Sequence, residues 1–136
     1  EPYRPTAAEI EDVGIDAAAF FAGQQPLKAP MRDEHGEVIP LAAPSGRKLP
    51  PAGHIFRAAG CEKCHGSGYS GRTGLYEVLT VTEEIRRLAI RNADSGQIKA
   101  AALAQGMRTL RDDGALKVVL GITTLDEVAR VTAEEA

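Results

Sequence analysis

The residues with the clearest potential for chemistry are two cysteines in the stretch GCEKCHGSGYSGRTG, which begins at Gly60. Cys61 and Cys64 are the only cysteines of the 136-residue chain, and two residues separate them. This CxxC spacing brings two thiolates to about 2.3 Å from one zinc ion. The glycines that follow let the chain turn back past the metal, because glycine readily adopts positive φ angles. The spacing therefore predicts half of a zinc site, with Cys61 and Cys64 as its ligands.

The other half of such a site is not evident in this chain. Zinc needs four ligands in a structural site, and the histidines His35, His54 and His65 are the remaining candidates. Each is more commonly a surface imidazole than a ligand. His65 also follows Cys64 directly, where it is poorly placed to close the same ion. From this chain alone the site is incomplete.

Three other functions compete for the same stretch. A redox pair of the thioredoxin type needs CxxC at the start of a helix, where the dipole lowers a thiol pKa, whereas glycines follow here. Gly66, Gly68 and Gly71 spell GxGxxG, but a dinucleotide site needs these glycines after a strand and before a helix. The pattern CxxCxGxG, which starts at Cys61, resembles the zinc repeat of J-domain co-chaperones. That family carries four such repeats, and this chain has one.

Composition excludes several classes of partner. The net charge is -3, which gives no reason to expect nucleic-acid binding, and aromatic residues make up only 4% of the chain, with no tryptophan for base stacking. No apolar run approaches the roughly 20 residues that span a membrane, so we expect no direct membrane span. Two cysteines at metal spacing, without a secretory signal, indicate a reducing compartment.

Chain-breaking residues divide the sequence into two predicted domains. All eight prolines lie at or before Pro51. We expect a metal-binding subdomain over residues 1–72, with a Pro-rich loop insertion at 23–51. A strand and a C-terminal helical subdomain are expected over residues 73–136.

Local patterns predict the elements of the first domain. The stretch from Thr6 to Phe21 predicts a short helix that Thr6 caps, with Glu9 completing a capping box. The letters HGEVI predict a hairpin turn at Gly36. A short strand is expected in HIFRAAG, which leads the chain to Cys61.

The second domain is predicted to be one strand and a set of helices. The β-branched and aromatic residues of TGLYEVLTV, from Thr73 to Val81, indicate a strand. Cap residues and apolar spacing then predict about four short helices that pack on one another or on a neighbouring domain. These helices are expected to start at Thr82, Ser95, Thr109 and Thr124, the last with a capping box to Glu127.

Other polar residues have simpler interpretations than catalysis. Adjacent Asp112 and Asp113 diverge on a helix, so they are interpreted as acids of a first helical turn rather than as a catalytic pair. Arg72, Arg108 and Arg111 are interpreted as solvated or capping residues, the alternative being contact with phosphate or an adjacent subunit. Tyr69 and Tyr76 are expected to pack. No set of nucleophile, base and orienting residue is present, and we assign no catalytic residue.

The order of the motifs gives a family resemblance. CxxC is followed by GYSGRTGLYEVL, EEIRRLAI and GMRTLRDDGALKVVLGITTLDEVARVT. This series, from Ile55 to Thr132, resembles the C-terminal end of the ATPases of type II secretion and type IV pilus assembly. The opening EPYRPTAAEIEDVGID is similar to family text that comes just after a first CxxC. The resemblance implies that the other half of the zinc site lies immediately upstream of Glu1.

The resemblance also implies a function. The family's members are hexameric motors of the cytoplasm, attached peripherally to the bacterial inner membrane through platform proteins. Their RecA-like α/β core binds ATP and Mg, and its Walker A pattern GxxxxGK[ST] does not occur here. The expected fold class is α+β: a zinc-ribbon-like β-hairpin subdomain, then a bundle of about four short helices, as a fragment of that larger ATPase. The implied role is a non-catalytic, metal-stabilised scaffold; the alternative is a zinc-binding fragment of a J-domain-type co-chaperone.

Overall fold

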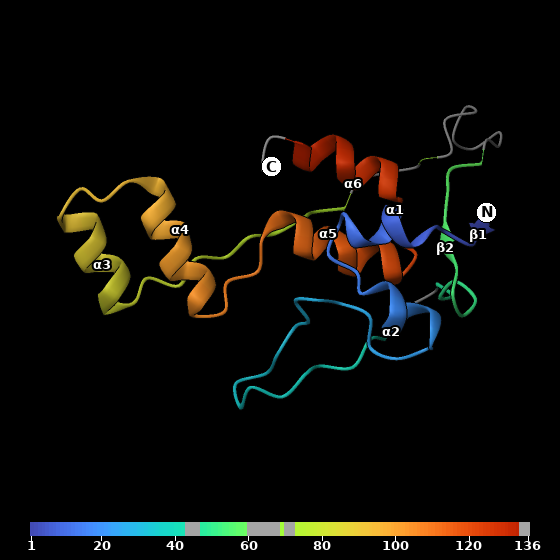
Figure 1. The fold of residues 1–136 in the computed structure, drawn as a ribbon, viewed down its shortest axis with the longest axis horizontal. Coiled ribbons are helices and arrows are strands. Elements are labelled where there is room, and N and C mark those ends of the chain that lie inside the picture. Colours follow the sequence, from blue (N-terminus) through green and yellow to red (C-terminus); the bar gives the residue numbers. More distant parts are fainter. Residues whose placement is uncertain (43–46, 60–68, 70–72, 134–136) are drawn as a thin grey trace.

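The fold is mostly helical, with one small sheet (Figure 1). A computed structural model describes residues 1–42, 47–59, 69 and 73–133. In chain order the elements are β1 (Pro2–Tyr3), α1 (Ala7–Glu11), α2 (Ala17–Phe21), β2 (Ile55–Phe56), α3 (Glu83–Ile90), α4 (Ser95–Ala104), α5 (Leu110–Val119) and α6 (Leu125–Thr132). Among the described residues, no helix has the length and apolar character that crossing a membrane requires.

Helix α5 lies at the centre of the hydrophobic core. Apolar residues of the N-terminal segment pack with α5 and α6 in one buried cluster, which includes Ile10, Ile15, Phe20, Ile55, Leu116, Val118 and Val128. Gly114 lets α5 approach α6 closely, because a Cβ there would lie 2.5 Å from Cγ1 of Val128. The core therefore joins segments from both ends of the chain around α5.

The N-terminal segment contains two helices where the sequence predicts one. Thr6 does cap α1, and Glu9 completes the capping box. The chain then turns at Gly14, whose φ of 95° favours glycine, and Asp16 caps the second helix by accepting from the N–H of Ala19. The single helix is thus interrupted by a turn and a new cap.

The four C-terminal helices are present, and their predicted starts are confirmed. Thr82, Thr109 and Thr124 cap α3, α5 and α6, while α4 begins at Ser95 with Asp94 as its cap. The capping box expected at Thr124 is only half formed. The hydroxyl of Thr124 accepts from the N–H of Glu127, but the Glu127 carboxylate pairs with Arg130.

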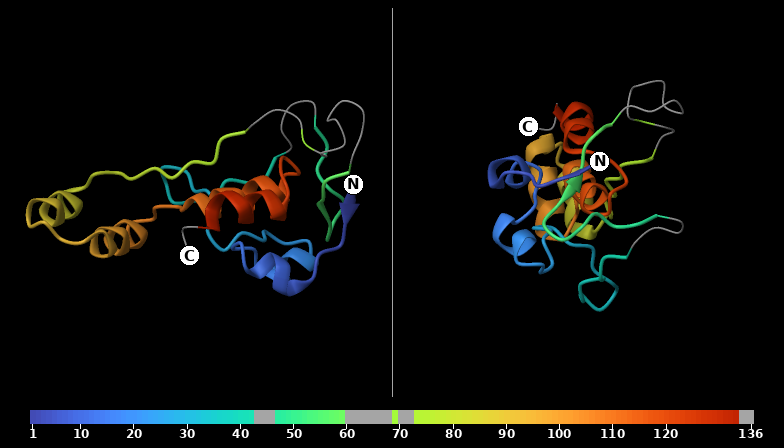
Figure 2. Two further views of the ribbon diagram at one scale, coloured as in Figure 1. Left: turned by 90° about the horizontal axis from the view of Figure 1, so that it is seen from above. Right: turned by 90° about the vertical axis from the view of Figure 1, so that its right-hand side faces the viewer.

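These helices do not form the single bundle that the sequence predicts. Helix α3 packs on α4, and α5 packs on α6. Both figures place the α3–α4 pair well away from α5 and α6, at the end of two extended stretches of chain (Figures 1 and 2). Ile85 is the one buried residue of α3, and Ala102 is the one buried residue of α4.

The prediction of a strand from Thr73 to Val81 is wrong in this structure. The segment runs extended, but it pairs with no strand among the described residues, and a strand exists only with a partner. The strand expected in HIFRAAG is shorter than predicted. It is reduced to β2, which pairs antiparallel with β1 through Pro2 opposite Phe56 and Tyr3 opposite Ile55.

The remaining predictions for the first domain have different outcomes. The hairpin turn at Gly36 is confirmed by a bridge between Arg32 and Val38, and the Asp33 carboxylate accepts the N–H groups of His35 and Glu37. The zinc-ribbon-like hairpin falls on residues outside the described part of the chain. The division at residues 72 and 73 therefore stays a prediction.

The capping box of α1 predicts a pH-dependent contribution to stability. The backbone N–H and hydroxyl of Thr6 hold the pKa of Glu9 below its usual 4.5. A carboxylate with a lowered folded-state pKa stabilises the fold above the unfolded-state pKa, and this contribution disappears as the pH falls through the folded-state value. Glu9→Gln should therefore lower the free energy of unfolding at pH 7 and have less effect near pH 3, as measured by urea unfolding.

Glu84→Gln is the matched control, because Glu84 is an exposed acid of the first turn of α3 and the capping hydroxyl of Thr82 bonds to Ile85 instead. Its effect should be small and similar at both pH values. An equal loss for Glu9→Gln at both pH values would contradict the role of its ionised carboxylate.

Candidate functional site

The predicted metal ligands Cys61 and Cys64 lie outside the described residues, as does His65. Of the other histidines, His54 places Nδ1 2.9 Å from the carbonyl oxygen of Ala52. His35 is exposed, with Nε2 3.5 Å from the Glu34 carboxylate. Within the described part of the chain, no group of three or more His, Cys, Asp or Glu side chains has the arrangement of a metal site.

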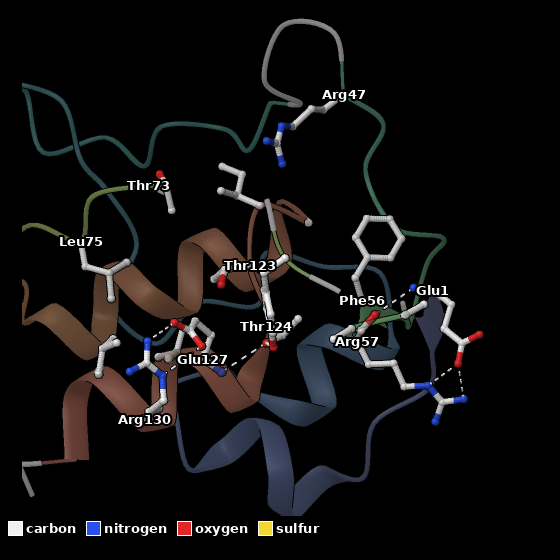
Figure 3. A pocket seen from close by; sticks show the side chains of 17 residues that line it. Glu1, Arg47, Phe56, Arg57, Thr73, Leu75, Thr123, Thr124, Glu127 and Arg130 are labelled. Carbon is white, nitrogen blue, oxygen red and sulfur yellow. Dashed lines mark hydrogen bonds and ion pairs between the residues drawn. The ribbon is translucent and has the colours of Figure 1, made fainter. Parts of the chain in front are cut away.

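A broad cavity is lined in part by described residues next to the cysteines in the sequence (Figure 3). Its volume is about 990 Å³. Residues just before, within and just after the cysteine segment line it: Ala58, Ala59, Tyr69 and Thr73. The opposite wall comes from the loop before α6 and from α6 itself, including Thr123, Thr124, Glu127 and Arg130. The described ends of the cysteine segment therefore lie against the α6 side of the core.

Charged side chains around this cavity are largely paired. Glu1 and Arg57 join the ends of β1 and β2, with Oε1 2.7 Å from Nη2, and the amino terminus donates to the Arg57 carbonyl at 2.8 Å. On the other wall Arg130 pairs with Glu127 and holds the pKa of that carboxyl below its usual value. Figure 3 shows the two pairs on opposite sides of the cavity. These charges fix local geometry.

A second cluster surrounds Asp113, which sequence reasoning treated only as an acid of a first helical turn. Its side chain is 7% exposed and lies 3.5 Å from both Arg108 and Lys117. Its Oδ2 also accepts the backbone N–H of Tyr76 at 3.1 Å. The Asp113 carboxylate thus fastens the extended segment to α5. The i,i+4 spacing to Lys117 is the sequence signal for part of this cluster, but the contact with Tyr76 has no local signature.

Arg108 extends the cluster to the Pro-rich segment. Its Nε donates to the carbonyl oxygen of Ala29 at 2.8 Å, and Nη2 donates to the carbonyl of Asp112 at 3.1 Å. Asp112 itself completes the capping box of α5 with Thr109, as expected for an acid of the first turn. Arg108 therefore links three segments and is half-buried.

Arg111 and Gln105 make further links between segments. Arg111 donates from α5 to the hydroxyl and the carbonyl of Thr132, near the end of α6, at 3.2 and 3.3 Å. Gln105 donates to the Thr80 carbonyl and accepts from the Thr82 hydroxyl, both at 2.8 Å, which closes the base of the α3–α4 pair. Arg72 lies outside the described residues.

The two tyrosines expected to pack differ in environment. Tyr69 places its hydroxyl 2.8 Å from that of Thr124, and its side chain lines the large cavity. Tyr76 is 65% exposed, so the packing expected of it is wrong in this structure. It lines a smaller cavity of about 410 Å³ together with Val78, Thr80 and residues of the Asp113 cluster.

Removing the Asp113 carboxylate should destabilise the fold. Asp113→Ala leaves Arg108 and Lys117 without their shared partner and the Tyr76 N–H without its acceptor. We expect a loss of about 2 to 3 kcal/mol in the free energy of unfolding, measured by urea titration. The control Asp126→Ala removes an exposed first-turn acid of α6 and should change it by less than about 0.5 kcal/mol. Equal effects of the two variants would contradict the role assigned to Asp113.

Comparison with known proteins gives the family. The profile described as "Type II/IV secretion system protein" matches residues 35–130. The chain is 36% identical over 135 residues to "Type II secretion system protein E" of Pseudomonas aeruginosa, which covers 99% of this chain and 20% of that protein. It is 44% identical over 80 residues to "Type IV pilus assembly ATPase PilB" of Thermus thermophilus, covering 59% of this chain and 9% of that protein.

A third relative supports the same assignment. "Type II secretion system protein HxcR" of Pseudomonas aeruginosa is 44% identical over 79 residues, which cover 58% of this chain and 17% of that protein. The chain thus spans only 9 to 20% of the length of these three relatives. On the strength of the profile match, which covers more than half of the chain, the chain belongs to the type II/IV secretion system protein family.

Proposed function

We propose that this chain is a non-catalytic C-terminal part of a hexameric ATPase that powers type II protein secretion or type IV pilus assembly. The observation that carries this proposal is the alignment over 135 residues with type II secretion system protein E. Relatives of both systems match at the same 44% identity, so both remain in the proposal. This family match favours the ATPase over the co-chaperone alternative.

The catalytic work is assigned to another part of the polypeptide. GxxxxGK[ST] does not occur in these 136 residues, so we place ATP and Mg in an α/β core outside them. The charged side chains described above are used in internal links, as in the cluster around Asp113. Such links suit a scaffold that holds its shape while other parts turn over nucleotide.

The scaffold's proposed partners are the ATPase core of the same polypeptide, the other subunits of a homo-hexamer and platform proteins of the inner membrane. The proposed location is cytoplasmic, at the bacterial inner membrane through those partners. The α3–α4 pair extends away from the core on two extended stretches of chain (Figure 2). That placement gives it access to partners, which supports a role in contacts between proteins.

We also propose that Cys61 and Cys64 supply two of the four ligands of a structural zinc ion, with the other two upstream of Glu1. The support is the CxxC spacing and the family match around it. Such a site would pin residues 1–59 to the segment that follows, since the two pairs of ligands would lie far apart in sequence. Structural zinc contributes folding free energy directly, on the order of 10 kcal/mol in small zinc units.

If the catalytic core lies outside this chain, the chain alone should not hydrolyse ATP. The whole protein should hydrolyse ATP, whereas the 136-residue chain alone should release phosphate no faster than buffer. A coupled phosphate-release assay on both, at equal molar concentration, measures this. Hydrolysis by the chain alone, sensitive to substitution of its own residues, would overturn the proposal.

The zinc proposal predicts metal content. The whole protein should contain about one zinc ion per polypeptide, measured by inductively coupled plasma mass spectrometry. The Cys61→Ser and Cys64→Ser variants should each lose most of this zinc. The control Ser67→Ala changes the same stretch but keeps both thiols, so its zinc content should match the unsubstituted protein. Unchanged zinc in the two cysteine variants would remove these residues from the site.

A further inference from the structure

The extended segment from Thr73 to Val81 has the residue types of a buried strand, but several of its large apolar side chains are exposed. Its sequence TGLYEVLTV is rich in β-branched and aromatic residues. In the structure Tyr76, Val78, Leu79 and Val81 are all exposed, Val78 by 72%. Large apolar side chains exposed together along one segment mark an interaction surface.

One edge of this segment is already occupied. The N–H of Tyr76 donates to Asp113, and the carbonyl of Thr80 accepts from Gln105. In an extended chain the main-chain groups of alternate residues point to the same edge, so residues 76, 78 and 80 share this one. Side chains of α5 and of the end of α4 cover it in place of a strand.

The opposite edge is open. It belongs to Leu75, Glu77 and Leu79, whose main-chain groups form no hydrogen bond within the described part of the chain. The Glu77 carboxylate accepts from the N–H of Leu110, so its side chain is held while its main chain stays free. An open edge that is flanked by apolar side chains is a template for strand addition.

We propose that this segment joins a β-sheet of the upstream ATPase core, pairing through the main-chain groups of Leu75, Glu77 and Leu79. The inference rests on the proposed function. The three relatives compared above are five to eleven times longer than the matched region, so most of such a protein lies outside it. Strand addition uses main-chain groups for affinity and alternate side chains for specificity.

A second copy of the chain fits this edge less well than the core does. Symmetric antiparallel pairing of two copies, centred on Glu77, would set two carboxylates opposite each other, and like charges in that position are destabilising. Pairing within one polypeptide also has the advantage of a high effective concentration. The pairing would fix α5 to the core, because Asp113 binds the other edge of the same segment.

Hydrogen exchange with residue-level fragmentation tests the proposal. The whole protein and the 136-residue chain are compared. In the whole protein the N–H groups of Glu77 and Leu79 should exchange at least about 100-fold more slowly than in the chain alone. The N–H of Val78, on the edge that faces Asp113, should slow far less and serves as the internal control.

The outcomes distinguish pairing with the ATPase core from pairing with a second copy of the chain. Equal exchange of Glu77 and Leu79 in both proteins would overturn the proposal. Protection that appears in the chain alone as its concentration rises would overturn it in favour of self-association. If the whole protein hydrolyses ATP but these N–H groups are not protected, the proposed function stands and the strand pairing is wrong. If the groups are protected but no ATP is hydrolysed, the strand pairing stands and the proposed function is wrong.

Matched proline variants of the whole protein give a second test. Leu79→Pro removes an N–H from the open edge, whereas Val78→Pro removes one from the edge that has no strand, where proline is tolerated. Leu79→Pro should abolish the protection at Glu77, and Val78→Pro should preserve most of it. Because both side chains are exposed in the chain alone, both variants of that chain should keep its helical circular dichroism. Equal loss of protection in the two variants would contradict the assignment of edges.

Discussion

The buried carboxylate of Asp113 is the interaction on which the arrangement of segments depends. A charge removed from water must find partners, and Asp113 finds two cations and one main-chain N–H. Each partner comes from a different place: Lys117 from α5 itself, Arg108 from the stretch before it, and Tyr76 from a segment 37 residues earlier. Arg108 then reaches the carbonyl of Ala29, so the Pro-rich segment is attached to the same point.

This cluster explains why α5 organises both halves of the chain. Its apolar face supplies the centre of the core, and Gly114 admits α6 at close range. Its polar N-terminal part binds the extended segment that leads to α3 and α4. Those two helices form a separate pair that gains little burial from the core. The structure therefore combines a packed centre with an outlying pair of helices, whose own buried apolar residues are Ile85 and Ala102.

Features that depend on local sequence were predictable, and features that depend on distant partners were not. Thr6, Thr82 and Thr109 each cap a helix, because the threonine hydroxyl accepts from one of the unpaired N–H groups of the first turn. A threonine just before a helical pattern can be recognised in the sequence alone. The segment from Thr73 to Val81 has strand-forming residues, yet a ladder needs a second strand that these residues do not supply. The hydrogen bond from the Tyr76 N–H to Asp113 likewise joins residues 37 positions apart, so neither end predicts the other. Of the candidate site, the cavity walls are described, while Cys61 and Cys64 fall outside the described residues.

Sequencing the gene would show whether this chain is one part of a secretion or pilus ATPase that carries half of its zinc site. The measurement is the nucleotide sequence upstream of the codon for Glu1. We expect a second CxxC directly before Glu1 and a GxxxxGK[ST] motif farther upstream in the same reading frame. A start codon close to Glu1, with no cysteine pair and no such motif before it, would rule out both the ATPase origin and the shared zinc site.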